Sequence, residues 1–186
     1  MPEKDDFLDD LKRPETREAS FHRLVSEYKE RLYWHIRKIV LLHEDADDVL
    51  QNTFIKVFRH IDGFKGDSKL YSWMYRIATN EALDHLKRKA KHMHVDISEM
   101  QERVVKNLES DSYFDGDAIQ KKLQEAIIKL PQRQQLVFNM RYFDEMKYEE
   151  IASILEVSVG SLKASYHHAR KKIEEFIRES QTMAHG

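Results

Sequence analysis

One predicted helix near the C-terminal end, from Val159 to about Arg178, carries side chains whose types and spacing suit the binding of DNA. Its outward face is expected to hold small polar residues first and cations behind them: Ser161, Lys163, Ala164, Ser165, His167, His168, Lys171 and Lys172. In a major groove, small polar side chains approach base edges while cations hold phosphates. The alternative is an ordinary antiparallel helical pair with a solvated face.

The segment before that helix completes a helix-turn-helix pattern over 148–176. The first helix contains the small Ala152, which allows the second helix to cross closely, and Val157 can fill the corner between them. Such a turn often uses Gly for a left-handed backbone. Glu156 stands there instead, and a positive φ would cost this residue about 1 kcal/mol. The inward stripe of the second helix steps by three and four residues: Val159, Leu162, Tyr166, Ala169 and Ile173.

Apolar residues with this same helical spacing recur along most of the chain, so the sequence predicts an all-α fold. In the first half the stripes run over 21–40, 49–61 and about 69–91. Gly63 ends the second of these helices, and a loop over 64–68 leads into the third. No pattern of period two persists, so no strand is expected.

We expect two small helical domains joined by an acidic linker. The boundaries are an acidic N-terminal extension (1–19), a first domain (20–91), the linker (92–117), a second domain (118–179) and a tail (180–186). The linker loses strong helical periodicity, although a short helix is expected around 98–108. Its acidic residues suggest the hypothesis that the linker screens nearby basic faces until a partner binds.

The distribution of charge is more informative than the net charge of −2. Basic residues gather over 87–91 and again over 163–172, and the acidic stretch 96–117 divides them. Two separated basic stretches predict two contacts with one polyanion, although two solvated helix faces would look the same. The acidic N-terminus is no signal peptide and no apolar run could span a membrane, so we expect a cytoplasmic protein without membrane insertion.

Several chemistries are excluded by the residue types. Without Cys, the chain can form no disulfide, Cys-ligated zinc site or thiol nucleophile. Its five scattered Gly form no phosphate cradle. His92 and His94 lack the i, i+4 spacing of helical metal ligands, and the adjacent His167 and His168 point apart on a helix. We therefore expect no metal, no cofactor and no enzymatic activity.

Two segments resemble a known family. The helix-turn-helix segment 148–176 (YEEIASILEVSVGSLKASYHHARKKIEEF) resembles region 4.2 of the sigma-70 family, particularly the extracytoplasmic-function (group IV) sigma factors. Residues 45–89 (DADDVLQNTFIKVFRHIDGFKGDSKLYSWMYRIATNEALDHLKRK) closely resemble region 2 of that group. The resemblance spans about 20–90 and 118–178, in the right order around a variable linker. It implies a sigma factor that binds core RNA polymerase, recognises −10 and −35 promoter elements and promotes promoter opening.

For the second domain, the resemblance implies recognition of the −35 element. The implied contacts are those on the outward helix face named above, joined by Arg141 and Arg170. Ser165 and His168 occupy positions at which the family often has Arg. This departure predicts weak binding of the −35 element or a different −35 sequence.

Residues 45–58 look like region 2.2, the family's surface for the polymerase clamp helices. An amphipathic helix, which Asp45 is expected to cap, would expose polar side chains beside aromatic rings to a partner coiled coil. The implied contacts are Asp45, Asp48, Gln51, Asn52, Phe54 and Phe58. A core helix with a solvated face is the alternative, and it applies to Phe54 in particular.

Residues 64–89 look like regions 2.3 and 2.4, which melt and read the −10 element. Capture of unpaired bases needs stacking platforms, a cationic track and polar groups in loops. The loop 65–69 is expected to pocket a flipped base through its backbone and the Asp67 and Ser68 oxygens. The implied contacts are Phe64, Lys65, Gly66, Asp67, Ser68, Lys69, Tyr71, Trp73, Arg76, Asn80, Lys87 and Arg88. Trp73 could instead be a core residue, and Phe64 could cap the preceding helix.

The resemblance implies three partners: core RNA polymerase, promoter DNA and an anti-sigma factor, which in this family is often membrane-linked. The alternative function is a helix-turn-helix regulator that binds DNA without polymerase. The first domain distinguishes a sigma factor from such a regulator, because a plain regulator needs no second basic, aromatic-rich helix after the loop 64–68.

Overall fold

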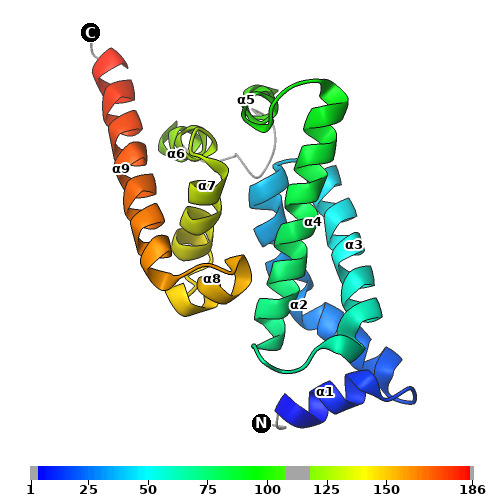
Figure 1. Ribbon diagram of the computed structural model, residues 1–186. Coiled ribbons are helices and arrows are strands. Elements are labelled where there is room, and N and C mark those ends of the chain that lie inside the picture. Colours follow the sequence, from blue (N-terminus) through cyan, green and yellow to red (C-terminus); the bar gives the residue numbers. More distant parts are fainter. Residues whose placement is uncertain (1–3, 108–117, 185–186) are drawn as a thin grey trace. The chain divides into compact units, whose positions relative to one another are not determined.

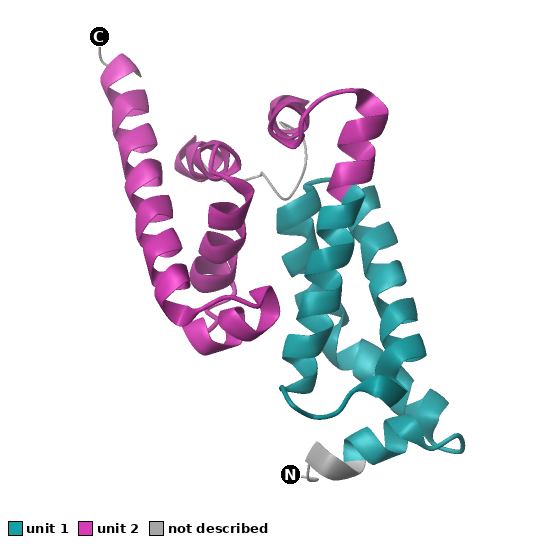
Figure 2. Ribbon diagram, viewed as in Figure 1, with its two compact units in different colours: residues 1–85 teal, residues 86–186 magenta. Residues whose placement is uncertain are grey.

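The computed structural model describes residues 4–107 and 118–184. These residues form helices and turns without a strand, which confirms the predicted all-α class (Figure 1). The chain divides into two compact units, residues 1–85 and residues 86–186 (Figure 2). The helices, in order, are α1 (Lys4–Lys12), α2 (Arg17–Val40), α3 (His43–His60), η1 (Ile61–Gly63), α4 (Leu70–Met93), α5 (Ile97–Asn107), α6 (Ala118–Ile128), α7 (Gln132–Phe138), the π-helical turn η3 (Asn139–Phe143), α8 (Tyr148–Leu155) and α9 (Val159–Ala184).

Unit 1 is built on the apolar stripes that the sequence predicts. Leu24, Leu32 and Ile36 of α2 are completely buried, and α2 packs along α3. On α4, Met74 and Ala78 are equally buried, so all three predicted helices turn their apolar faces to one core. Apolar burial of this kind is the main favourable term in folding, and it fixes the three helices as one scaffold.

The start of α3 differs from the prediction. The helix begins at His43, and Leu42 occupies the N-cap position, so Asp45 is not the cap. Asp45 lies instead in the first helical turn beside Glu44, where the helix dipole favours anions. The prediction of Asp45 as N-cap was therefore wrong by a few residues, because several acidic residues in succession are equally compatible with a helix start.

The N-terminal extension contains an ordered helix. α1 packs against α2 and against the 3-10 turn η1, and its Leu11 is completely buried. Composition alone indicated only an acidic segment there. Burial of Leu11, with the half-buried Phe7 and Leu8 beside it, explains why a short acidic helix is nevertheless held against the remainder of unit 1.

The core of the second unit is formed by α6, α7 and α9. Its cluster of buried apolar residues comprises Ala126, Ile127, Leu130, Phe138, Ala169 and Ile173. α5, at the position of the short helix predicted within the linker, packs against α6. Gln101 of α5 and Gln135 of α7 pair through reciprocal amide hydrogen bonds of 3.4 and 3.2 Å. The rest of the predicted linker, 108–117, lies outside the described residues.

In the turn between α8 and α9, a residue other than glycine adopts the left-handed backbone conformation. Glu156 has φ 56° and ψ 47°, and its backbone N–H donates to the Ala152 carbonyl to close α8. The sequence left open whether this position needs a positive φ, and the structure shows that it does. The conformation is unfavourable for a residue other than glycine, because its Cβ crowds the following carbonyl. No described helix is long and apolar enough to cross a membrane.

We predict that Glu156→Gly raises the free energy of unfolding by about 1 kcal/mol, because glycine adopts this backbone conformation without strain. Urea unfolding followed by circular dichroism measures the change. The matched control is Glu179→Gly at an exposed position inside α9, which should lower stability by about 1 kcal/mol. A loss of stability in both variants would contradict the strain at Glu156.

Candidate nucleic-acid and partner interfaces

The outward face of α9 agrees with the pattern read from the sequence. Leu162 and Ala169 are completely buried and point to the core of this unit. The opposite face is exposed at Lys163, Ala164, His167, His168, Arg170, Lys171 and Lys172, while Ser161 and Ser165 are half-buried. A helix with small residues at its start and cations along its outer face has the layout that major-groove binding requires.

Several polar groups on this face already have partners. Arg133 of α7 donates to the Ser161 hydroxyl at 3.0 Å, and Arg170 pairs with Glu174 at 3.4 Å one turn later. The Lys163 ammonium lies 5.8 Å from the centre of the Tyr148 ring. Arg133 therefore adds a cation at the start of α9 that sequence reasoning missed. It lies 28 residues before Ser161, so no local motif links the two.

Arg141 has a different position from the one predicted for a DNA contact. Its guanidinium donates to the Met146 carbonyl at 2.9 Å and lies 5.0 Å from the centre of the Tyr148 ring. The side chain is half-buried. Arg141 thus closes the turn between η3 and α8. Its guanidinium, the group that would contact a phosphate, is engaged within the protein.

The loop between η1 and α4 is open to solvent where the sequence predicts base capture. Lys65, Gly66, Asp67 and Lys69 are exposed and Ser68 is half-exposed. Gly66 has φ +78°, a conformation that side chains of L-residues rarely adopt, so the turn of the loop depends on glycine here. The loop therefore presents cations, a carboxylate and a hydroxyl within five residues.

Phe64, predicted as a stacking platform, belongs to the core beneath this loop. Its side chain is only 6% exposed, and its ring packs on the Trp73 ring at a centroid distance of 5.2 Å. The ring therefore has no free face to offer a base in this structure. Trp73 itself is half-buried, in line with the core alternative that the sequence left open.

Tyr71 is the better placed aromatic residue on α4. It is partly exposed, and two cations flank it: the Lys69 ammonium lies 5.7 Å and the Arg31 guanidinium 6.0 Å from the ring centre. Asn80 is exposed and Arg76 half-exposed further along α4. This combination of an accessible ring with neighbouring cations is what single-strand binding uses.

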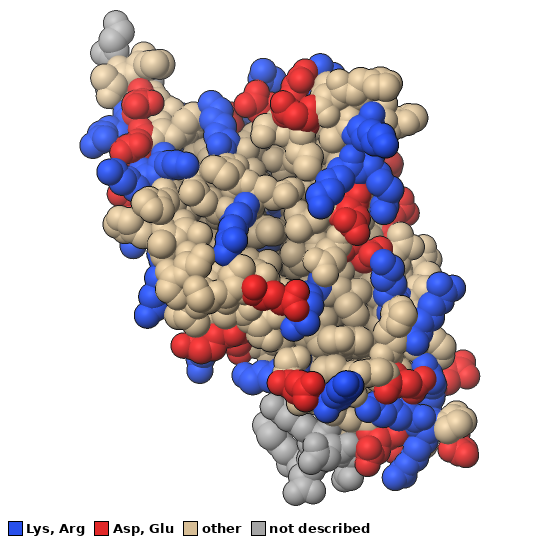
Figure 3. All heavy atoms as spheres, viewed as in Figure 1, with Lys and Arg blue, Asp and Glu red and all other residues tan. Residues whose placement is uncertain are grey.

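The C-terminal end of α4 carries the first basic stretch, and Lys and Arg atoms gather there in Figure 3. Lys87 and Arg88 are exposed, as is Lys91. Elsewhere on the face that Figure 3 shows, cationic and anionic side chains are interspersed. The cations predicted for the −10 element thus include an accessible group at the end of α4.

The predicted polymerase surface on α3 divides into an outer and an inner set. Asp48, Gln51, Asn52 and Phe58 are exposed as expected. Phe54 is only 8% exposed and belongs to the core, as the alternative reading allowed. Asp45 turns toward α4, where one of its carboxylate oxygens lies 3.2 Å from His85 Nε2. Asp45 is therefore partly withdrawn from the outer face of α3.

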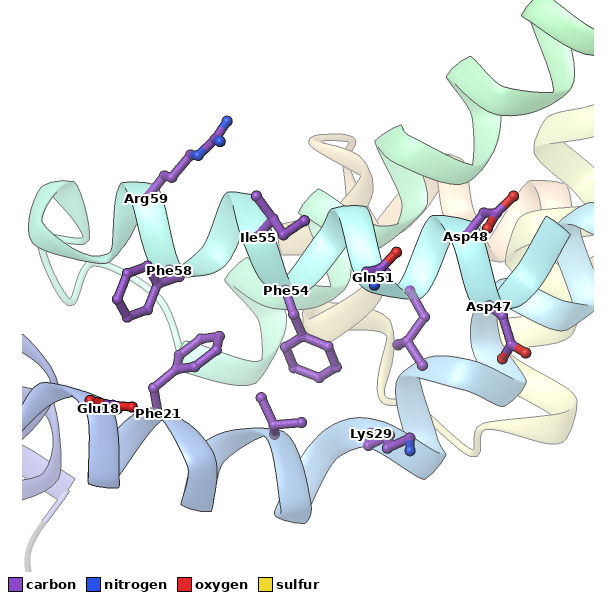
Figure 4. A pocket seen from close by; sticks show the side chains of 12 residues that line it. Glu18, Phe21, Lys29, Asp47, Asp48, Gln51, Phe54, Ile55, Phe58 and Arg59 are labelled. Carbon is purple, nitrogen blue, oxygen red and sulfur yellow. The ribbon is translucent and has the colours of Figure 1, made fainter. Parts of the chain in front are cut away.

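A groove of about 950 Å³ runs between α2 and α3 along this face. Rings meet in it edge to face: Phe21 lies 4.9 Å from Phe58 and 6.3 Å from Phe54 (Figure 4). The wall formed by α2 was missed, because its apolar residues fit the predicted core stripe. The groove is lined by Glu18, Phe21, Val25, Lys29, Asp47, Asp48, Leu50, Gln51, Phe54, Ile55, Phe58 and Arg59.

The edges of the groove combine apolar and charged side chains. Phe58 is 39% and Ile55 43% exposed, so two large apolar side chains lie together at the edge of the groove. Asp47 and Asp48 lie together toward one end, and Glu18 lies near Phe58 toward the other (Figure 4). Lys29 and Arg59 also line the groove, so its edges carry both signs of charge. An apolar floor with a polar rim is the usual anatomy of a protein-binding surface.

Two further observations bear on the chemistry of these surfaces. Burial of the Tyr28 side chain raises its pKa above the usual value, and the neighbouring Glu27 adds to the shift, so Tyr28 stays neutral around pH 7. Within the described ranges, no group of three or more His, Asp or Glu side chains is arranged to hold a metal ion.

Comparisons with known proteins agree in both units. Residues 24–92 match the model of Sigma-70 region 2, and residues 120–173 match the model of Sigma-70, region 4. The chain is 28% identical over 172 residues to the ECF RNA polymerase sigma factor SigW of Bacillus subtilis, with 86% of this chain and 90% of that protein covered. It is 29% identical over 167 residues to the RNA polymerase sigma-H factor of Pseudomonas aeruginosa, covering 86% of each.

Solved structures share the fold. CnrH in complex with the cytosolic domain of CnrY matches with a TM-score of 0.63 at 21% identity, over 87% of this chain and 90% of that one. The sigma factor RpoE of Bartonella quintana, in complex with the anti-sigma factor NepR, matches with a TM-score of 0.64 at 19% identity, over 85% and 96%. With regions 2 and 4 both matched in order, the chain belongs to the sigma-70 family, as an ECF-type sigma factor that binds RNA polymerase and recognises promoters.

Proposed function

We propose that three separate surfaces divide the work of this sigma factor. The α2–α3 groove with the outer face of α3 docks on core RNA polymerase, the loop 65–69 with α4 takes the unpaired −10 strand, and the outer face of α9 enters the −35 major groove. The observation that carries the proposal is the groove, because a regulator that bound DNA alone would have no use for it. We also propose that the polymerase and −10 contacts lie mainly within 20–91 and the −35 contacts within 118–179, with the segment 92–117 between these stretches of sequence.

The groove has the dimensions and chemistry for a helical partner. It lies between two helices, has a floor of aromatic rings and leaves Ile55 and Phe58 partly exposed. An amphipathic helix or a coiled coil buries its apolar side chains in such a groove. Asp47 and Asp48 on the rim would then meet cations of the partner. We assign this surface to a coiled coil of the core enzyme.

On the DNA side, the −10 and −35 surfaces differ in what they offer. The −10 loop combines polar atoms with the neighbouring Tyr71 ring and Lys69, which suits unpaired bases. The face of α9 offers small side chains flanked by cations, which suits duplex DNA. In this proposal Arg133 takes the place of the predicted contact Arg141, which pairs within the protein. Tyr71, already among the predicted contacts, supplies the ring for stacking, because Phe64 is buried.

The same surfaces explain how such a protein is kept inactive. The solved neighbour RpoE was captured with an anti-sigma factor, NepR. We infer that an anti-sigma factor, in some cases linked to a membrane, also binds this chain and covers the apolar groove until it is released. The chain itself catalyses no reaction and acts in the cytoplasm, where polymerase and promoters are found.

Run-off transcription with purified core polymerase tests the proposal as a whole. We expect promoter-specific transcripts only when this chain is added. Binding of DNA without any association with core polymerase at low salt would instead indicate the alternative, a helix-turn-helix regulator that acts alone.

We predict that Ile55→Ser weakens binding to core polymerase about tenfold, because an apolar side chain at the groove edge no longer becomes buried in the complex. Fluorescence anisotropy of labelled protein titrated with core enzyme measures the affinity. Ile119→Ser is the matched control, since Ile119 is an exposed isoleucine of α6 outside the groove. Equal losses in the two variants would remove the groove from the interface.

We predict that combined substitution of Lys65, Asp67 and Ser68 by alanine slows promoter opening more than it weakens binding of duplex promoter DNA, because the loop addresses unpaired bases. A fluorescent base analogue within the −10 element reports opening, and a filter-binding assay reports binding. Parallel losses in both assays would show that the loop serves duplex binding.

We predict that the segment 96–186 binds duplex DNA with a log–log salt slope of about −3.6, from the four phosphate contacts of Lys163, Arg170, Lys171 and Lys172. Replacing all four by alanine should bring the slope close to zero. The control replaces Lys121 and Lys122 of α6, which lie off this face, and should leave the slope unchanged. A slope close to zero in the unmodified segment would reject the four contacts.

A further inference from the structure

The segment just before the family's matched regions contacts the base of the −10 loop. Lys12, the last residue of α1, donates a hydrogen bond from its ammonium to the Phe64 carbonyl at 2.8 Å. Phe64 is the residue immediately before the exposed loop 65–69. α1 and its Lys12 lie outside residues 24–92, over which region 2 is matched, whereas the acceptor Phe64 lies within them.

With this bond Phe64 is anchored in three ways. Its N–H donates to the Ile61 carbonyl at 3.1 Å, its ring is buried against Trp73, and its carbonyl accepts from Lys12. A residue held by backbone, side chain and an outside donor has little freedom, whereas Lys65, the next residue, is exposed. The loop that we assign to base capture therefore begins from a fixed point.

Arg17, the first residue of α2, supplies a second contact from the same side. Its guanidinium pairs with Asp62 of η1 at 3.0 Å and also donates to the Phe58 carbonyl. It lies 4.6 Å from the centre of the Phe58 ring, which is part of the groove. Arg17 thus connects the groove to the turn that leads into the loop.

The short connection from α1 to α2 holds both cations in place. Leu11 is completely buried, and the Thr16 hydroxyl donates to the Asp10 carbonyl at 2.7 Å, which closes the turn between the helices. Because charge-assisted hydrogen bonds to a carbonyl or carboxylate are stronger than neutral ones, two of them can order the neighbouring backbone.

We propose that Lys12 and Arg17 are positioning residues for promoter opening: they fix the start of the −10 loop so that its polar groups are arranged before DNA arrives. This inference rests on the proposed role of the loop 65–69. A prearranged loop captures a base without first losing its own conformational freedom, which speeds the opening step. Neither residue touches DNA in this scheme.

The test uses the full chain with three substitutions at neighbouring cations. Lys12→Met removes the donor while keeping the length of the side chain, and Lys12→Arg keeps a donor. Arg13→Met is the matched control, since it removes a positive charge from the adjacent exposed position. Hydrogen exchange measured by mass spectrometry reports the order of 61–70, and α9 in the same sample serves as the internal reference.

We expect Lys12→Met to raise amide exchange in the loop and to slow promoter opening, each about tenfold, the effect of one charge-assisted hydrogen bond. The affinity for core polymerase should stay within about twofold, and exchange in α9 should not change. Lys12→Arg should recover most of both losses, and Arg13→Met should resemble the unmodified chain.

Unchanged loop exchange in Lys12→Met would overturn the inference, as would equal defects in Lys12→Met and Arg13→Met. The alanine substitutions in the loop separate this failure from a failure of the proposed function. If they slow opening while Lys12→Met does not, the inference is wrong and the loop assignment stands. If the loop substitutions themselves leave opening unchanged, the proposed function of the loop is wrong, and the positioning role is refuted with it.

Discussion

A buried hydrogen bond between α2 and α4 fixes the frame on which unit 1 depends. His35 Nε2 lies 2.8 Å from the Thr79 hydroxyl, and that hydroxyl donates its own proton to the Tyr75 carbonyl. The hydroxyl has one proton, so His35 Nε2 must donate to it. Because an unpaired polar group in this core would be costly, sliding α4 by one turn along α2 is disfavoured. The position of the loop 65–69 at the start of α4 follows from this register.

α3 is connected to the same helix by an ion pair and by a second close polar contact. Lys56 pairs with Glu81, whose side chain is almost buried, and Asp45 approaches His85. These contacts hold the inner side of α3 against α4. The outer side of α3, with Phe58 and Ile55, borders the groove. One helix therefore both packs against α4 and forms one wall of the groove. The division between the two roles follows the helical repeat, as three to four residues separate neighbours on one face.

The sequence predicted the helices well, but it could not predict how each proposed site residue is buried and paired, for physical reasons. Helical periodicity reveals which face is apolar, so the stripes on α2, α4 and α9 agreed with the structure. It does not reveal whether a residue at the border of the apolar face, such as Phe54, lies in the core or on the surface, because that depends on which helix packs beside it. Arg141 and Phe64 show the same limit, since the type of a side chain suggests a ligand while its neighbours in space decide whether it is free. The contact of Arg133 could not be predicted from the sequence, because only the fold brings this residue to Ser161.

The loop conformation at Gly66 has a consequence of another kind. A Cβ built at this position meets no atom within 4 Å, so there is room for a side chain, and the obstacle is the φ of +78° alone. That value is unfavourable for L-residues and favourable for their mirror images. A D-alanine placed there by chemical synthesis would fill empty space and restrict the loop to the fold it already has. At Gly66, therefore, the chirality of the residue limits which side chains the loop tolerates, and lack of space does not.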